Sequence, residues 1–173
     1  MKKYIGKLVR LNFTDIDPIN GILIDFNEDW ILIQSNPVDY IIDGYFVISK
    51  KNLKTVEYSK NEKWKEKVII LKNIRVPIKA KISLDNIEII FKTLNKRYGV
   101  FTIFKKENNV CWLGGLRSID DKFLTINDLN PKGQWKGEVK FKINKIRVIE
   151  YDTDYINSLK LVLKKSISKT GSR

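Results

Sequence analysis

The chain contains no histidine, and this absence excludes several kinds of catalytic and metal site. Ser-His-Asp and Cys-His nucleophiles need an imidazole base, and the usual zinc sites combine histidine with cysteine. Cys111 is the one cysteine, so an internal disulfide is impossible. It lies beside Trp112 in an apolar stretch, which favours a packed, unreactive thiol. We therefore expect no enzyme, no cofactor and no metal.

Long apolar runs are also missing. No stretch approaches the roughly 20 apolar residues that a membrane-spanning helix needs. The N-terminal segment 1–6 carries charge but has no apolar core behind it, so it does not resemble a signal peptide. Together with the scarcity of cysteine, this predicts a cytoplasmic protein without a membrane partner.

Arginine is scarce although the chain is strongly basic. The net charge is +13, and only six of the 33 basic residues are arginine. Residues 1–58 hold 7 Lys and Arg against 8 Asp and Glu, whereas residues 59–108 hold 13 against 5 and residues 109–173 hold 13 against 7. This asymmetry indicates a polyanion-binding surface, such as one for nucleic acid. The alternative is that the lysines are solvated surface residues.

The sequence contains an internal repeat. Gly21–Ile33 aligns without a gap on Gly114–Ile126, at an offset of 93 residues. The alignment places Trp30 on Phe123, and the same offset places residues 56–58 on residues 149–151. A fixed-period match of this kind indicates one structural unit that occurs twice.

Each repeat predicts five short strands, because alternating apolar residues are separated by turn-forming residues. The expected strands lie near residues 4–13, 21–26, 30–34, 45–48 and 53–58, and then near 100–104, 110–118, 123–127, 139–143 and 146–151. Helices are expected after Ser59, where a capping-box pattern begins, from about Ser83 to Gly99, and after Asp152 or Thr153. Segment 75–82 reads as a linker or an edge strand. The spacing predicts that Trp30, Trp64 and Trp112 belong to the core.

These elements predict a mainly β protein with a few helices, an α+β arrangement of two small barrels. The expected units are a first barrel at 1–58, a helical connector at 59–82 and a second barrel with flanking helices at 83–165. Residues 166–173 read as a flexible polar tail.

The first unit resembles the Sm-like branch of the SH3-like small barrels. Gly21–Trp30 is similar to the first motif of that family, and Gly44–Leu53 is similar to the second. The resemblance implies two tandem SH3-like barrels that bind single-stranded RNA through two turns. Asn27 and Asp29 match the first of these turns, and the matches in the second are Lys50, Lys51 and Asn52. The paired arrangement is also similar to proteins found in bacteria.

A loop in the second unit carries a tryptophan between basic residues and glycines. Within residues 130–137, Trp135 could stack on a base while Lys132 and Lys136 contact phosphates. Tyr40 occupies the equivalent loop of the first unit. The alternative is that Trp135 folds back to close the end of the barrel.

Two functions remain open at this point. The first is a non-enzymatic module that binds RNA or single-stranded DNA through a basic surface of the second barrel. The second is an adaptor that binds a protein partner at an exposed sheet edge.

Overall fold

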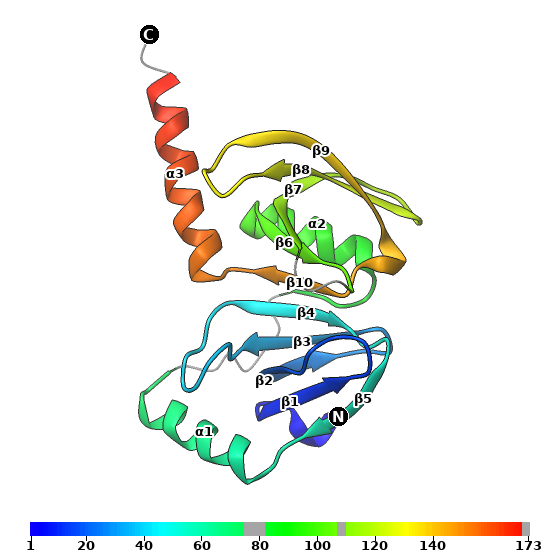
Figure 1. Cartoon of the computed structure of the whole chain (residues 1–173), viewed down its shortest axis with the longest axis vertical. Helices are drawn as coiled ribbons and strands as arrows, with labels where there is room; N and C mark the ends of the chain where they lie inside the picture. Colours follow the sequence, from blue (N-terminus) through cyan, green and yellow to red (C-terminus); the bar gives the residue numbers. More distant parts are fainter. Residues whose placement is uncertain (75–81, 107–109, 171–173) are drawn as a thin grey trace.

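Ten antiparallel strands form one open sheet in the computed structural model, which describes residues 1–74, 82–106 and 110–170 (Figure 1). The strands are β1 (Leu8–Phe13), β2 (Ile19–Phe26), β3 (Trp30–Ser35), β4 (Tyr45–Ser49), β5 (Leu53–Glu57), β6 (Phe101–Phe104), β7 (Cys111–Ile119), β8 (Phe123–Leu129), β9 (Trp135–Lys142) and β10 (Val148–Tyr151). Their order across the sheet is β5-β1-β2-β3-β4-β10-β6-β7-β8-β9. The prediction of a mainly β protein with a few helices is confirmed.

The prediction of two tandem Sm-like barrels is wrong. A closed barrel would need β4 to return to the strands of its own half, but β4 pairs with β10 of the other half, with Ile48 opposite Val148 and Tyr45 opposite Tyr151. Hydrogen bonding therefore continues across the middle of the sheet. The free edges of the sheet are β5 and β9.

The repeat in the sequence corresponds to a repeat of strand order within this single sheet. The first half runs β5-β1-β2-β3-β4, and the second runs β10-β6-β7-β8-β9 in the same relative order. The irregularities repeat as well, because the register shifts between Leu23 and Asp25 in β2 and between Leu116 and Ser118 in β7.

Two glycines at equivalent positions allow a close approach between neighbouring strands. A Cβ atom on Gly21 would lie 2.5 Å from the carbonyl oxygen of Gln34, and one on Gly114 would lie 2.1 Å from that of Asn127. Both contacts are with backbone, which cannot move aside without disturbing the strand pairing.

Gly114→Ala is expected to lower the free energy of unfolding by about 1–3 kcal/mol or more, since an added methyl overpacks the junction of β7 and β8. Gly21→Ala should act in the same direction through β3. Urea denaturation of both variants measures the effect. Unchanged midpoints would contradict the close strand approach.

Three α-helices complete the described part of the chain: α1 (Lys60–Leu71), α2 (Ile87–Tyr98) and α3 (Asp154–Thr170). The predicted capping box forms at the start of α1, between Ser59 and Glu62. Asn86 caps α2, so that helix begins four residues later than the predicted Ser83, and it ends at Gly99 as predicted. The polar tail expected at 166–173 falls on the end of α3 and on residues outside the described part. The linker or edge strand expected at 75–82 lies, apart from Ile82, outside it too.

Helix α2 packs against β6 and β7 of the second half (Figure 1). Its Ile90, Phe91 and Leu94 belong to the largest apolar cluster. That cluster joins Trp30 and other side chains of β2–β4 to inward-facing residues of β6–β10. One helix thus supplies core to both halves. A separate cluster beneath the first half is built on Val9, Leu11 and neighbouring strand residues.

Candidate nucleic-acid interface

The turn between β7 and β8 fixes the position of Phe123. The Asp120 carboxylate accepts hydrogen bonds from the backbone N–H groups of Lys122 (2.8 Å) and Phe123 (2.7 Å). These two hydrogen bonds lower the pKa of Asp120, and the charges of Lys140 and Lys122 act in the same direction. Asp120 is therefore an ionised turn former.

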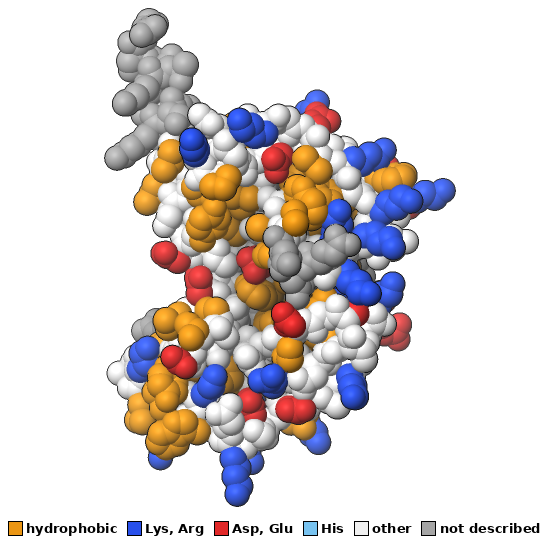
Figure 2. All heavy atoms as spheres, in the orientation of Figure 1, with side chains coloured by type: hydrophobic (Ala, Val, Ile, Leu, Met, Phe, Trp, Pro, Cys, Tyr) orange, Lys and Arg blue, Asp and Glu red, His pale blue; other side chains and the backbone are white. Residues whose placement is uncertain are grey.

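Phe123 lies on a solvent-facing part of the sheet among lysines. It pairs with Lys142 across β8 and β9. The ammonium nitrogen of Lys140 lies 4.2 Å from the centre of the Phe123 ring, a cation–π contact. Figure 2 shows Lys and Arg side chains gathered at the upper right, near the end of β9 and the β7–β8 turn.

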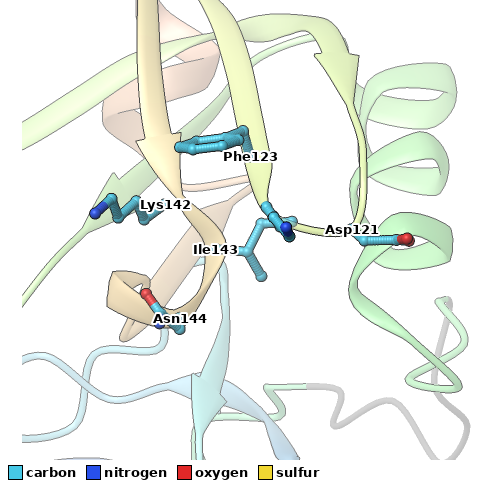
Figure 3. Close-up of a pocket in the computed structure, with 6 residues that line it drawn as sticks. Asp121, Phe123, Lys142, Ile143 and Asn144 are labelled. Carbon is cyan, nitrogen blue, oxygen red and sulfur yellow. The ribbon is translucent and has the colours of Figure 1, made fainter.

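A pocket of about 400 Å³ opens beside this ring, and we call it the Phe123 pocket. Its lining residues are Asp121, Lys122, Phe123, Lys142, Ile143 and Asn144. Figure 3 shows Phe123 and Lys142 from neighbouring strands on one side, Ile143 and Asn144 beyond the end of β9, and Asp121 directed away from them. The pocket thus offers an aromatic ring, an amide and two lysines.

Comparison of the two halves explains why this face is basic. At the 93-residue offset, Trp30, Leu32 and Val47 correspond to Phe123, Thr125 and Lys140. The first three are buried in the cluster that contains α2. Lys140 is exposed, and Phe123 and Thr125 are partly exposed. The face that the first half uses as core is a solvent-facing surface in the second half.

We call this surface the outer face of β7–β9. Its residues are Arg117, Phe123, Thr125, Glu138, Lys140 and Lys142. Arg117 and Glu138 form an exposed ion pair, with 3.1 Å between Nε and Oε1. Glu138 is thereby partly neutralised, and the lysines beside Phe123 dominate the local charge.

The residues expected at the two turns of the first half do come together, but their polar groups are used by the fold. The Asn27 side chain accepts from the N–H groups of Asp29 (2.9 Å) and Trp30 (2.7 Å). The Lys50 ammonium donates to the Asn27 carbonyl at 2.9 Å, and the Lys50 N–H donates to the Asp29 carbonyl at 2.7 Å.

Lys51 and Asn52 complete this turn. Asn52 has a φ of 61°, the left-handed conformation that asparagine tolerates better than most residues. Lys51 is exposed and lines a second cavity of about 670 Å³ between the halves, together with Asp29, Lys50 and the start of α2. Because Glu28 and Asp85 also line it, this cavity has mixed charge.

The residues expected in the Trp135 loop are exposed at the start of β9. Trp135 is 52% exposed, although the edge of its ring lies beside Gly115 of β7, so it is not enclosed, and Lys132 and Lys136 are exposed too. Tyr40 is different. It packs against Leu8, Ile22 and Ile69 beneath α1 and is therefore not an equivalent of Trp135.

The expected site residues do not form one site. Trp135 and Lys142 are the two ends of β9, and seven steps along a strand span roughly 23 Å. The first-half turn residues lie beyond the Lys142 end, where Asn144 lines both the Phe123 pocket and the larger cavity.

No family model, no curated protein and no solved structure matches this chain. The Sm-like resemblance therefore has no support from relatives, and the single open sheet contradicts it. The case for a function depends on the geometry of this chain alone.

Neither metal binding nor a reactive thiol emerges from the described residues. No group of three or more His, Cys, Asp or Glu side chains among them could hold a metal ion. Cys111 is exposed, not packed as predicted. Partial burial of its thiol, with a smaller contribution from the Glu150 charge, raises the pKa of Cys111. The reactive thiolate is therefore disfavoured.

Four residues of the candidate site were not predicted from the sequence: Phe123, Lys140, Lys142 and Asn144. A signal for three of them was present. Aligning the repeats places Lys140 on an apolar position and Lys142 on a serine, on the strand that pairs with Phe123. A position that is valine in one copy of the unit and lysine in the other indicates that this face of the sheet is buried in the first copy and exposed to solvent in the second.

Proposed function

We propose that the protein binds single-stranded nucleic acid, preferably RNA, across the outer face of β7–β9. The observation that carries the proposal is Phe123, an aromatic ring on a solvent-facing sheet surface, with lysines beside it and an open pocket at its side. Exposed aromatic rings stack on unpaired bases of any sequence, and lysines neutralise the phosphates between them.

The geometry favours a single strand over a duplex. Stacking on Phe123 needs an unpaired base, because paired bases are stacked within their own helix. Lys140 and Lys142 are two residues apart on one strand, about 7 Å along it, and their side chains lie on the same face. Two cations in a row suit a backbone that runs along β9, with Asn144 able to donate to or accept from a base edge.

Charged residues on both sheet edges argue against the adaptor alternative. β9 carries Lys136, Lys140 and Lys142, and β5 carries Lys54 and Glu57. Charged side chains, and lysine above all, discourage the addition of a further strand at a sheet edge. The observations therefore favour nucleic acid over a partner strand.

Phe123→Ala is expected to weaken binding of labelled single-stranded RNA roughly 10-fold or more, because one base–aromatic stack contributes about 1–3 kcal/mol. Fluorescence anisotropy at several salt concentrations measures this. Affinity should fall with salt, and Lys140→Ala should make that dependence shallower.

Trp135→Ala and Lys63→Ala are the matched controls. Trp135 is an exposed aromatic at the far end of β9, so its replacement tests whether the site extends that far. Lys63 is an exposed lysine on α1, and its loss should leave affinity nearly unchanged. Binding that responds equally to Lys63→Ala and Lys140→Ala, and not to Phe123→Ala, would show a diffuse attraction to lysines and refute the proposed site.

A further inference from the structure

Helix α1 is attached to the sheet largely through its acidic residues. The Glu66 carboxylate accepts hydrogen bonds from the Leu8 N–H (2.8 Å) and from the Tyr58 hydroxyl (3.0 Å). Glu62 is buried and completes the capping box with Ser59. Ile69 is the one buried apolar residue of the helix. The acidic side chains of α1 therefore face inward.

Most apolar side chains of α1 face solvent instead. Trp64 is 57% exposed, contrary to the prediction that it belongs to the core, and Leu71 is 70% exposed. Ile70 is exposed as well. The loop after β3 adds exposed Val38 and Ile41.

The loop and the helix adjoin each other, because Lys72, directly after α1, donates to the Tyr40 carbonyl at 3.2 Å. Figure 2 shows hydrophobic side chains gathered at the lower left, over α1 and this loop. We call these five residues the α1 patch: Val38, Ile41, Trp64, Ile70 and Leu71.

The lysines of α1 share the outward side with the patch. Lys60, Lys63 and Lys67 are exposed and follow one helix face together with Trp64, at spacings of three and four residues. The Lys67 ammonium lies 5.9 Å from the centre of the Trp64 ring. With Glu62 and Glu66 turned inward, this surface of the helix combines apolar groups with positive charge and presents no acid of its own.

We propose that the α1 patch binds the surface of an anionic phospholipid bilayer. A partner must be negatively charged to satisfy the lysines and apolar to cover Leu71, Ile70 and Trp64. Nucleic acid has the charge but leaves the aliphatic side chains in water. A second copy of this face would bring lysines against lysines. An anionic bilayer offers both phosphate head groups and acyl chains, as basic interfacial helices with Trp and Leu require.

The patch is at a protruding end of the molecule, which suits a bilayer better than a groove-binding peptide. Its side chains are more than half exposed, and they come from a helix end and a loop tip. None of the described helices is long and apolar enough to cross a membrane. Surface binding needs only these side chains to insert, so it revises the expectation that membranes are not partners.

Helix α1 and β9 lie at opposite ends of the fold (Figure 1), so the lipid proposal is independent of the nucleic-acid proposal.

Sedimentation with vesicles tests the proposal. The full chain should pellet with phosphatidylcholine vesicles that contain phosphatidylglycerol and stay in solution with phosphatidylcholine alone. Leu71→Asp should weaken the partition at least 10-fold, and Lys67→Glu should weaken it at low salt. Leu161→Asp is the matched control, since Leu161 is 64% exposed on α3, away from the patch, and should leave the partition unchanged.

Three outcomes would overturn the proposal. The first is no association with anionic vesicles at low salt. The second is association that Lys67→Glu weakens and Leu71→Asp does not, which would mean attraction to lysines without insertion. The third is self-association in light scattering that Leu71→Asp abolishes without any effect of lipid, which would assign the patch to a second copy of the chain. Circular dichroism of each variant checks that the fold is retained.

Discussion

Arg147→Ala should destabilise the protein by about 3–5 kcal/mol, because it removes one partner of a buried ion pair. The Arg147 side chain is 3% exposed and that of Asp15 is 10% exposed, with 3.0 Å between Nη2 and Oδ1. The guanidinium also donates to the backbone carbonyls of Ser49 and Lys51. It thus links the start of β10 to two loops of the first half. Without it, the Asp15 carboxylate loses its ion-pair partner and two carbonyls lose a donor.

Thermal or urea unfolding measures the loss, which corresponds to a fall in Tm on the order of 10 °C for a chain of this size. Arg117→Ala is the matched control. Arg117 also pairs with a carboxylate at 3.1 Å, but both partners are more than half exposed, so about 0–1 kcal/mol is expected. Equal losses in the two variants would show that burial of Arg147 does not matter.

A double variant separates the ion pair from the rest of the network. Replacing both charges, as in Arg147→Met with Asp15→Asn, should cost less than the two single changes added together, since no unpaired charge is left. The remaining loss would report the hydrogen bonds to Ser49 and Lys51. Additive losses would mean that the pair contributes nothing beyond its separate contacts.

Arg147 also shows where sequence reasoning stops. Its counterpart in the first half, at the 93-residue offset, is Lys54, which is exposed on the edge strand β5. The pattern of neighbouring residues predicts the same surroundings for Lys54 and Arg147. Arg147 is buried because β10 lies in the middle of the sheet, against β4, and this pairing joins residues about a hundred positions apart.

The strands and helices could be predicted because their signals come from residues close together in the sequence. The joining of the two halves could not, because it depends on a pairing between distant strands. Turn formers and alternating apolar residues located all ten strands, and Ser59 with Glu62 located the start of α1. These signals involve residues within a few positions of each other. Whether a five-stranded unit closes on itself or continues into a second unit depends on the partner of β4. Nothing in the local pattern of β4 specifies that partner.

The same distinction between local and long-range signals applies to the candidate site. A surface position for Trp135, Lys132 and Lys136 was one of two interpretations of the sequence, because glycines and lysines around an aromatic residue indicate a surface loop; the other had Trp135 folded back onto the barrel. The partial exposure of Phe123 was not predicted, since its alignment with the core residue Trp30 indicated burial. The surroundings distinguish the two residues: Trp30 is buried in the apolar cluster that contains α2, whereas Phe123 lies outside that cluster and is partly exposed.

Glu150 is expected to make the protein less stable at pH 8 than at pH 5. It lies on β10, between Phe46 of β4 and Thr102 of β6. A small cavity of about 140 Å³ that it lines is mainly apolar, with Asp17 at its rim. Burial raises the pKa of Glu150 to about 7, and the nearby Asp43 carboxylate adds to the shift.

The direction of this pH dependence follows from proton binding to Glu150. The folded state holds a proton on Glu150 up to about pH 7, whereas the unfolded chain releases it near the ordinary glutamate pKa of 4.5. Stability from this group is therefore complete below about pH 4.5 and is lost as pH rises through 7. The shift corresponds to a loss of about 3 kcal/mol at most, since one pKa unit equals about 1.4 kcal/mol.

Glu150→Gln keeps the shape of the side chain and removes its charge. The variant should match the wild type near pH 5 and exceed its stability by up to about 3 kcal/mol at pH 8. Denaturant titrations at both pH values measure the difference, which cancels the effects of all other titrating groups. Glu57→Gln, at the equivalent position on the exposed edge strand β5, should change stability little at either pH. A Glu150→Gln variant that is less stable than the wild type at pH 8 would mean that the carboxylate is held by favourable charges, and that the middle of the sheet tolerates its ionised form.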